Sequence, residues 1–585
     1  MTIFNLISMI GGLTFFLYGM NVMSSSLEKM AGGRLEEMLR RMTANPLLSL
    51  ALGAVITIAV QSSSAVTVML VGLVNSGIMS FAQTVHVVFG SNIGTTLTAW
   101  LTSMAGIESD SFWMQMLKPI NFSPILAFIG IGFIMLSKND KKKTLGTIFV
   151  GFAILMFGMD VMSDAVSPLA DMPEFGQLLI HFNNPIVGVL IGALFTGMIQ
   201  SSAASVGILQ ALSLTGSITY GMAFPIVMGQ NIGTCVTALI SSIGTTTKAR
   251  RVAVLHIALN TICSIICLIV MLAAQALIPA VSGLMAQAVQ PWDIAMLHTL
   301  FNIIATVTLM PFAKQLVWLV ETIVKEKAGA VHPSEGSMLD ERLLRSPSVA
   351  VGESFHVSKD MCRQAHEILQ QAISLFENYD PAMEETILRA EDKLDHYEDK
   401  LGTYLVKLSS QALSSQDSQV VSKILHAIGD FERLGDHACN LVDVAKELYT
   451  KQISFSPNAT KEIKILTDAI QEILNITACA YDGNSAELAA KVEPLEQVID
   501  GLIAKIRANH IRRLQKGTCT IEGGFILADL LNNYERVSDH CSNIAVAIIE
   551  VEHNSFDTHK YLNGVKYGNS VFNEIYDSFQ KKYEL

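Results

Sequence analysis

Charged residues are scarce in this sequence, and they are unevenly placed. Asp, Glu, Lys and Arg make up 16% of the 585 residues, none occurs from Pro46 to Phe81, and residues 1–320 hold only short clusters. Half of the chain is apolar and its mean hydropathy is +0.42, which is too apolar for an ordinary soluble protein. We therefore expect residues 1–320 to lie in a membrane and the charge-rich residues 345–585 to be soluble. A net charge of −12 disfavours nucleic acid as a partner.

Several motifs that would indicate other functions are missing as well. The eight cysteines form no Cys-x-x-Cys pair and no secretory framework, which favours reduced thiols used as small apolar side chains. No Gly-x-x-x-x-Gly-Lys-Ser/Thr loop is present, so ATP is not expected to drive the protein directly. The first apolar run has no basic residues before it and no cleavage site after it, so we expect residues 3–23 to remain as a span. Nothing points to covalent chemistry, and we do not expect an enzyme.

Apolar runs long enough to cross a membrane recur through the first 320 residues. A helix needs roughly 20 such residues to cross the hydrocarbon. Runs of about this length lie at 3–23, 82–104, 118–137, 144–163, 219–243, 252–279 and 294–320. Two further segments, 46–79 and 185–218, are too long for one span and too short for two. We expect each to enter the membrane, break and return, which is tolerated where protein or water covers the broken backbone.

A polar motif at the middle of one of these two segments is repeated in the other. Gln61-Ser62-Ser63 recurs as Gln200-Ser201-Ser202, an offset of 200 − 61 = 139 residues. The same offset relates Asn45-Pro46 to Asn184-Pro185, and Asn92-Ile93-Gly94-Thr95 to Asn231-Ile232-Gly233-Thr234. A constant offset over this length predicts a duplicated unit. The copies differ at one position, because Ser64 of the first corresponds to Ala203 of the second.

The loop charges predict opposite orientations for the two copies. Lys and Arg in short loops stay in the cytoplasm. The loop after the first span carries Lys29, Arg34, Arg40 and Arg41, whereas its counterpart carries Asp164, Asp171 and Glu174. One element later, Glu108 and Asp110 of the first copy correspond to Lys248, Arg250 and Arg251 of the second, and Lys138, Lys141, Lys142 and Lys143 lie between the copies. We therefore expect an external N-terminus, a cytoplasmic C-terminal half and inverted repeats, which are typical of secondary transporters.

The repeated polar motifs are candidates for a binding site between the copies. Free N–H groups at a helix break suit an anion, and carbonyl and hydroxyl oxygens suit a hard cation such as sodium. The Asn-Ile-Gly-Thr elements lie inside spans and are expected to complete the site from a facing helix. The candidates are Gln61, Ser62, Ser63, Ser64, Asn92, Thr95, Thr96, Gln200, Ser201, Ser202, Asn231 and Thr234. The alternative is structural, with small residues for close packing and kinks satisfied by threonine hydroxyls.

Five other polar positions in the membrane region are weaker candidates. Asp160 and its counterpart Asn21 lie near span ends, and an intramembrane acid can be functional or can reach the interface. The histidines are more simply explained as packed or hydrogen-bonded side chains than as proton relays; they are His86, His256 and His298.

The charge-rich half contains a second internal repeat. Residues 430–437 match residues 533–540, an offset of 103, and the pattern predicts amphipathic helices arranged as two three-helix bundles. Glu432 with Asp436, and Glu535 with Asp539, are spaced four apart, so each pair shares one helix face. Like charges at this spacing repel unless a cation lies between them, so each pair could hold a divalent or multinuclear metal. The alternative is that Arg433 and Arg536 neutralise these acids.

These motifs together resemble a known family. The paired Gln-Ser-Ser and Asn-Ile-Gly-Thr elements are similar to the signature of the type II sodium-phosphate cotransporters over about residues 1–320, and the charge-rich half resembles a PhoU-like domain with Glu-x-x-x-Asp metal motifs. The resemblance implies sodium-driven movement of inorganic phosphate, with both Gln-Ser-Ser motifs lining the sites, and a metal of divalent or iron type in the PhoU-like domain. Because Ala203 of the second copy corresponds to Ser64 of the first, the resemblance does not fix the number of sodium ions.

The sequence thus predicts an all-α polytopic membrane protein. Two inverted repeats, each with a re-entrant helical hairpin, are followed by a cytoplasmic PhoU-like helical bundle. The expected boundaries are 1–320 for the transmembrane domain (repeats at about 1–137 and 144–279 and a last span at 294–320), 321–345 for a linker, 346–560 for the PhoU-like domain and 561–585 for a tail.

The predicted function is sodium-coupled phosphate transport across the cell inner membrane, with the lipid bilayer as surroundings. Alternatives are transport of another small anion, phosphate export, or a membrane-anchored metal-binding regulator. The sequence leaves a homo-oligomer open.

Overall fold

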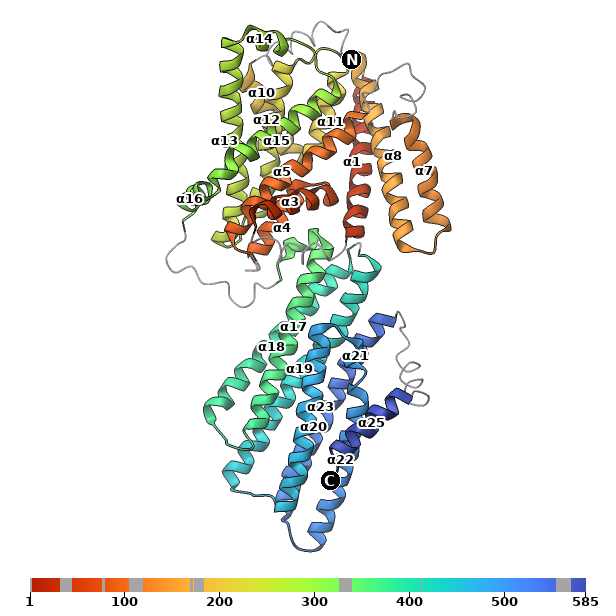
Figure 1. Ribbon diagram of the computed structural model, residues 1–585, viewed down its shortest axis with the longest axis vertical. Coiled ribbons are helices and arrows are strands. Elements are labelled where there is room, and N and C mark those ends of the chain that lie inside the picture. Colours follow the sequence, from red (N-terminus) through yellow and green to blue (C-terminus); the bar gives the residue numbers. More distant parts are fainter. Residues whose placement is uncertain are drawn as a thin grey trace. The chain divides into compact units, whose positions relative to one another are not determined.

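The computed structural model describes residues 3–31, 45–75, 79–104, 119–168, 172, 184–325, 339–411, 413–553 and 570–585. In these residues the regular structure is helical, apart from a single bridge between Thr219 and Ala288 (Figure 1). This confirms the all-α fold class. The chain divides into two compact units, Met1–Ala350 with Gln411–Ser415, and Val351–Ser410 with Gln416–Leu585. Each unit is described by itself.

The first unit contains the apolar helices. They are α1 (Ile3–Ala31), α3 (Pro46–Val60), α4 (Ser63–Asn75), α5 (Phe81–Ser103), α7 (Pro119–Leu136), α8 (Asp140–Val166), α10 (Pro185–Ile199), α11 (Ser202–Ser213), α12 (Tyr220–Ser241), α13 (Thr247–Leu277), α14 (Pro279–Met285), α15 (Pro291–Leu309) and α16 (Ala313–Ile323). Among the described residues, five helical stretches are long and apolar enough to cross a membrane: α1, α8, α12, α13 and α15 continued by α16.

Two of the seven predicted spans therefore form helices that are not among these five. The predicted span at 82–104 is α5, whose 23 residues include an asparagine, a glutamine and five threonines that lower its hydropathy. The span at 118–137 is α7, which has only 18 residues. The last predicted span, 294–320, is interrupted by the 3-10 helix η3 (Met310–Phe312), because Pro311 cannot continue the hydrogen-bond pattern of α15.

The segments 46–79 and 185–218 each contain two helices separated by a break. Asn45 and Asn184 cap α3 and α10 with their side chains, and each is followed by proline at the first helical position, where its missing N–H costs nothing. The first helix of each pair ends one residue before the glutamine, at Val60 and Ile199. The second begins at Ser63 or Ser202. The breaks therefore fall at the Gln-Ser-Ser motifs, as the sequence predicts.

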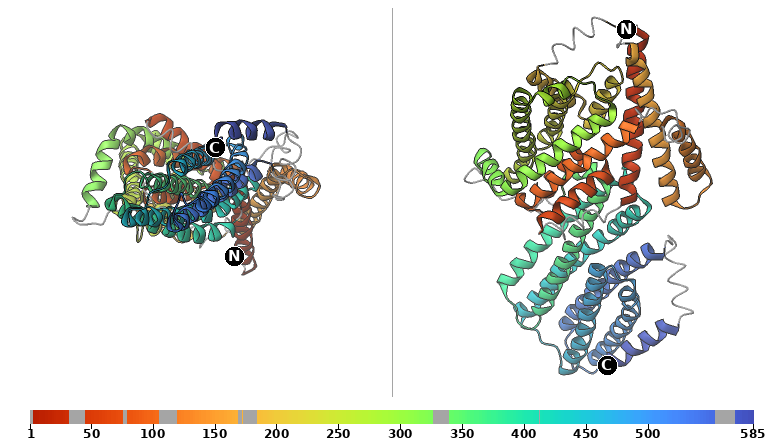
Figure 2. Two further views of the ribbon diagram at one scale, coloured as in Figure 1. Left: turned by 90° about the horizontal axis from the view of Figure 1, so that it is seen from below. Right: turned by 45° about the horizontal axis from the view of Figure 1, so that its top comes forward.

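The first helices of the two copies, α1 and α8, pack against each other through glycines. A Cβ on Gly19 would lie 2.3 Å from the backbone N of Leu155, and one on Gly12 would lie 2.9 Å from the carbonyl oxygen of Gly158. Gly158 is the counterpart of Gly19 (19 + 139 = 158), and Gly151, which also contacts Gly19, is the counterpart of Gly12 (12 + 139 = 151). The helices run side by side and antiparallel (Figures 1 and 2). Such reciprocal contacts are those of two copies related by a two-fold axis.

The second unit is a tandem of helices with a well-buried core. Its helices are α17 (Pro347–Ser374), α18 (Pro381–Ser409), α19 (Ser415–Lys451), α20 (Pro457–Gly483), α21 (Ala486–Ala489), α22 (Val492–Gln515), α23 (Ile521–His553) and α25 (Ser570–Lys582). Gly435 of α19 lies against Leu394 of α18 and Ile368 of α17, whereas α20, α22 and α23 pack on one another. These are two groups of three long helices. Of the predicted tail, residues 570–582 form α25, which packs on α22.

The two groups of three helices meet through reciprocal contacts. His437 Nδ1 lies 2.9 Å from Asn533 Oδ1, and His540 Nδ1 lies 2.8 Å from Asp430 Oδ1. With the offset of 103 residues, Asn533 is the counterpart of Asp430 and His540 that of His437. The second duplication is thus also arranged about a local two-fold axis.

Candidate functional site

Each break places a glutamine in the left-handed region of backbone conformation. Gln61 has φ 55° and ψ 22°, and Gln200 has φ 57° and ψ 24°. This region costs a residue with a Cβ roughly 1–2 kcal/mol, so a helix that ends in this way usually has Gly or Asn there. Both copies nevertheless have glutamine. Strain kept at two equivalent positions points to a use for the glutamine side chain.

The serine after each glutamine caps the second half-helix. Ser62 Oγ accepts a hydrogen bond from Ala65 N, and Ser201 Oγ accepts one from Ala204 N, each at 3.2 Å. The first N–H groups of α4 and α11 therefore open into the break, where the helix dipole favours negative charge. Neither segment, 46–79 or 185–218, contains Lys or Arg. An anion here would be held by hydroxyls, helix ends and bound cations.

The two breaks have the same backbone conformation but differ in their side-chain contacts. Gln61 Nε2 donates to Ile58 O at 2.6 Å, and Gln61 Oε1 accepts from Thr98 Oγ1 at 2.9 Å. The counterpart of Thr98 is Thr237 (98 + 139 = 237), whose Oγ1 is buried without a partner among the described residues. Gln200 is exposed. The first glutamine is thus fixed in place, whereas the second can turn toward a ligand.

Each hairpin packs its second half-helix against the opposite copy. The half-helix α4 packs on α12 and α13, and Ser64 Oγ donates to Thr234 O at 3.4 Å. In the second hairpin, Ala204 and Ile208 of α11 share an apolar cluster with Phe16 of α1. Both breaks therefore lie at the boundary between the two copies.

The two Asn-Ile-Gly-Thr elements do not behave alike. Asn92 Nδ2 donates to Asn260 Oδ1 at 3.0 Å, and Asn92 Oδ1 lies 3.2 Å from His256 Nε2. Both partners are on α13, so the Asn92 amide is engaged across the boundary between the copies. The amide of Asn231 instead donates to Val227 O within its own helix, at 2.9 Å. Thr95, Thr96 and Thr234 also bond carbonyls of their own helices, and their oxygens keep lone pairs for a ligand.

Comparison with known proteins supports the same division of the chain. The sequence model of the Na+/Pi-cotransporter family matches residues 15–164 and again residues 156–285, and that of the PhoU domain matches residues 359–445 and 463–548. The chain belongs to the Na+/Pi-cotransporter family. It is therefore a multi-pass membrane protein of a transporter family and not an enzyme, with two copies of the family unit followed by a tandem of PhoU domains.

Relatives of this Na+/Pi-cotransporter family member differ in length. The chain is 30% identical over 324 residues to uncharacterized protein YqeW of Bacillus subtilis, covering 55% of this chain and 99% of the relative. It is 21% identical over 552 residues to "Putative inorganic phosphate export protein YjbB" of Salmonella typhimurium, covering 93% and 97%. A 115-residue stretch is 33% identical to sodium-dependent phosphate transport protein 2A of Oryctolagus cuniculus, covering 19% of this chain and 18% of the relative.

Several polar residues near the breaks of this cotransporter-family chain were not predicted from the sequence. Thr57 donates to Ser91 Oγ in the first copy and Thr196 to Ser205 Oγ in the second, each at 2.8 Å. Gln230 Nε2 also donates to Ser205, at 2.9 Å. Thr57 and Thr196 obey the 139-residue offset, which is the signal that would have found them. His256, which we expected to be a packed side chain, is buried and hydrogen-bonded to Asn92.

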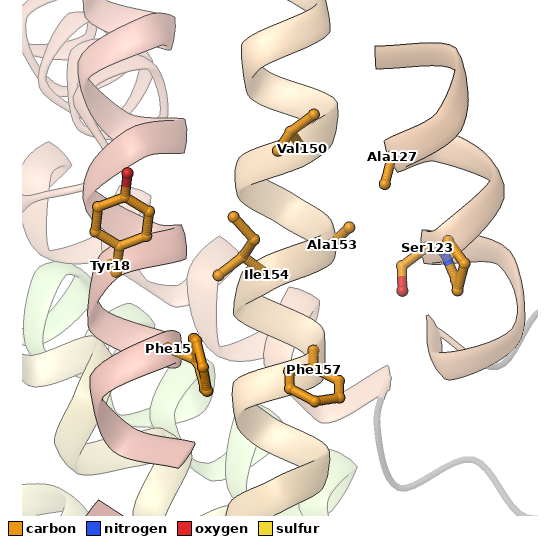
Figure 3. A pocket seen from close by; sticks show the side chains of 9 residues that line it. Phe15, Tyr18, Ser123, Ala127, Val150, Ala153, Ile154 and Phe157 are labelled. Atoms are coloured by element: carbon orange, nitrogen blue, oxygen red, sulfur yellow. The ribbon is translucent and has the colours of Figure 1, made fainter. Parts of the chain in front are cut away.

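Two apolar cavities occur among the described residues of the membrane unit. One, of about 350 Å³, lies among α1, α7 and α8 and is lined by Phe15, Tyr18, Phe157 and neighbouring residues (Figure 3). The other, of about 590 Å³, is lined by His86, Ile93, Thr306 and mostly apolar neighbours. None of the predicted site residues lines either cavity. Their apolar walls fit lipid chains better than a hydrated ion.

The predicted metal ligands lie in two unlike environments within the PhoU tandem. Burial, and then the nearby Asp436, raise the pKa of Glu432, and burial and Asp436 likewise raise that of Glu391. The acids of the first copy therefore crowd together. In the second copy Arg507 pairs with Glu535 at 2.8 Å and Arg536 with Asp539 at 3.3 Å. Across the described residues, no group of three or more His, Cys, Asp and Glu side chains is arranged to hold a metal ion.

Proposed function

We propose that this protein is a sodium-coupled secondary transporter of inorganic phosphate in the cell inner membrane. Phosphate is bound at the half-helix N-termini that begin after Gln61 and Gln200, and sodium at the nearby hydroxyl and carbonyl oxygens. Alternating access moves one inverted repeat against the other around this site. The PhoU domains lie in the cytoplasm and regulate the flux.

The observation that carries this proposal is the pair of strained, serine-capped breaks at equivalent positions of the two copies. A single capped break is explained by helix packing alone. Two breaks with the same left-handed glutamine, each at the boundary with the opposite copy, place two sets of free N–H donors at one boundary. Donors without fixed positive charge suit an anion that must be released as well as bound, and they leave charge compensation to the co-transported sodium.

The contacts at one end of the membrane unit support the proposed orientation. Arg251 after α12 pairs with Glu321 at the end of α16, at 3.2 Å. Asn75 at the end of α4 accepts a hydrogen bond from Thr246 N. The basic loop, the open end of the first hairpin and the chain leading to the PhoU domains therefore lie on one side. An impermeant maleimide applied to intact cells should label Gly283→Cys after α13 and not Lys142→Cys, and the reverse pattern would show the opposite orientation.

The transport activity is tested with labelled phosphate in proteoliposomes that carry a sodium gradient. Ser62→Ala with Ser201→Ala removes both caps and a hydroxyl from each break, and we expect uptake to fall by about tenfold or more. A matched double variant, Thr144→Ala with Thr322→Ala, removes two exposed hydroxyls that bond their own helices and should transport normally. Phosphate uptake that ignores sodium would contradict the coupling. No phosphate uptake in a folded, inserted protein would contradict the substrate, and other small anions would then be screened.

The direction of net flux is a second question, and the relatives favour export. YjbB, which is named as an inorganic phosphate export protein, aligns with 93% of this chain. A symporter runs either way according to its gradients, so the same site serves export when cytoplasmic phosphate is high. Cells loaded with labelled phosphate should lose it faster when they express this protein than when they express the Ser62→Ala, Ser201→Ala variant. Equal loss would favour uptake.

We further propose that the first PhoU domain binds a divalent or iron-type cation through Glu432 and Asp436, with Glu391 beside them. These oxygen ligands suit a hard cation, which would relieve their mutual repulsion. Glu535 and Asp539 fit less well, because arginines already neutralise them. The purified protein should contain metal that is lost on Glu432→Gln with Asp436→Asn and retained on Glu535→Gln with Asp539→Asn. Equal metal content in all three proteins would contradict this site.

A further inference from the structure

A short segment between the membrane helices and the PhoU domains is packed onto the membrane unit. It consists of Asp340, the 3-10 helix η4 (Glu341–Arg345) and Ser346, and we refer to these residues as the strap. Asp340 caps η4 by accepting from Arg342 N at 2.9 Å. Leu343 is fully buried, and Asp340 and Ser346 are 5% and 4% exposed. Connecting segments normally lie on the surface, so this burial requires partners.

The strap holds the far end of the half-helix α4. Asp340 Oδ2 accepts a hydrogen bond at 2.8 Å from Asn75 Nδ2, on the last residue of α4. One turn earlier, Leu343 occupies the space over Gly72, where a Cβ would lie 2.8 Å from Leu343 Cδ2. The other end of α4 begins at Ser63, beside the first break. A helix of 13 residues spans about 20 Å, so α4 links the strap rigidly to the candidate site.

The strap also holds the opposite copy. Arg342 Nε donates to Ser241 O at 2.6 Å and Arg342 Nη2 to Ile243 O at 2.9 Å, so the guanidinium binds carbonyls at the C-terminal end of α12. The same guanidinium pairs with Asp340 at 3.1 Å. Asn75 in turn accepts from Thr246 N, the residue that caps α13, at 2.8 Å. Asp340 and Arg342 therefore fasten α4 of the first copy to the α12–α13 turn of the second.

We propose that the strap is a conformational lock that ties the first hairpin to the second repeat and must release for transport, under the control of the PhoU domains. The inference rests on the proposed function, because only a transporter must move one repeat against the other. Pro347, the first residue of α17, directly follows the strap. A change of conformation in α17 would pull on Ser346 and weaken the contacts of Arg342 and Asp340, and the lock would open without any ligand at the transport site.

The first test measures release of the strap without measuring transport. A thiol at Leu343→Cys is shielded while the strap is bound, in a background where Cys439, Cys479 and Cys519 are serine. Asp340→Ala or Arg342→Ala should raise its rate of maleimide labelling by about tenfold, because each removes a charge-assisted contact. Arg345→Ala is the matched control, since Arg345 is exposed and its contact with Ser241 Oγ is long, at 3.5 Å. Equal labelling in all variants would overturn the lock.

The second test asks whether release is needed for flux. Gly72→Cys and Leu343→Cys place two thiols where the strap crosses α4. Oxidation should stop phosphate transport in proteoliposomes and reduction should restore it, whereas each single variant should be insensitive to oxidant. Full flux with the cross-link formed would overturn the lock. If the unmodified protein moves no phosphate at all, the proposed transport function is contradicted and this test cannot be applied to the strap. The labelling experiment then still decides whether the strap opens.

Discussion

At the scale of single residues, substitution of the two left-handed glutamines distinguishes a role of their backbone conformation from a role of their side chains. Gln61→Gly with Gln200→Gly keeps the backbone of both breaks, because glycine adopts this conformation without strain. We expect the stability of the double variant to remain within about 1 kcal/mol of wild type and its phosphate flux to fall by about tenfold, through loss of the amides. Thermal unfolding and uptake into proteoliposomes measure the two effects.

The matched control for this prediction is Gln452, another glutamine in the left-handed region, with φ 53° directly after α19 and an exposed side chain. Gln452→Gly should change neither flux nor folding to any large extent. If the double glutamine variant transports at the wild-type rate, the glutamine side chains have no part in transport.

A buried lysine in the PhoU tandem predicts a pH dependence. Lys423 is 2% exposed, and its ammonium bonds Asn484 Oδ1 at 2.6 Å and lies 3.9 Å from the ring centre of Phe355. Burial, together with Lys359, lowers the pKa of Lys423 to about 7. Between about pH 7 and 10 the unfolded chain therefore binds more protons than the folded one, and stability rises with pH in this range.

The second copy shows which replacement the fold tolerates at this position. The counterpart of Lys423 is Ile526 (423 + 103 = 526), which is 2% exposed. Lys423→Ile should raise the unfolding temperature of the PhoU region most at pH 7 and below, with a gain that shrinks toward pH 10. Thermal unfolding of the full chain at several pH values measures this. If the gain in unfolding temperature is the same at every pH, burial of the charged Lys423 ammonium is not what destabilises the fold.

At the scale of elements, the pairing of α1 with α8 depends on glycines that allow the backbones to touch. Gly19→Ala would place a Cβ 2.3 Å from Leu155 N, and a backbone atom cannot move aside cheaply. We expect a loss of about 1–3 kcal/mol or more, seen as reduced yield of monodisperse protein in detergent. Gly11→Ala, on the same helix, has nothing within 4 Å of its Cβ and should be harmless. Equal yields would show that this pair is not tightly packed.

The same elements show how far the sequence could predict the structure. The breaks followed from local signals, since Asn45-Pro46 starts a helix and the Gln-Ser-Ser motif interrupts it about 15 residues later. Asn92 was a site candidate by type and spacing, but its partners lie 164 and 168 residues away on α13. Such a contact depends on tertiary packing and leaves no periodic signal. Residues 340–345 of the strap fell in the predicted linker and Ser346 in the predicted PhoU-like domain, because nothing in this short, mostly polar sequence indicates burial. The burial depends on contacts with Asn75 and with the α12–α13 turn, which are distant in the sequence.

At the scale of the whole molecule, we propose that the membrane unit carries out transport and that the second unit controls it. The membrane unit contains both copies and both breaks, so nothing in the proposed transport site comes from the PhoU domains. The relative from Bacillus subtilis aligns along 99% of its length with only 55% of this chain, so shorter chains exist among its relatives. A protein that is chiefly a regulator would instead need the PhoU domains for all of its function.

Two truncations distinguish these possibilities and also separate the strap from the domains it precedes. Ending the chain after Lys325 removes the strap and the PhoU domains together, and we expect phosphate flux at or above the wild-type rate because the lock is gone. Ending it after Ala350 keeps the strap but removes what releases it, so flux should fall below that of the shorter chain, and Asp340→Ala should restore it. Loss of flux in both truncated proteins, each inserted and monodisperse, would identify a regulator. Equal flux in both truncated proteins would show that the membrane unit transports by itself and that the strap does not control the flux.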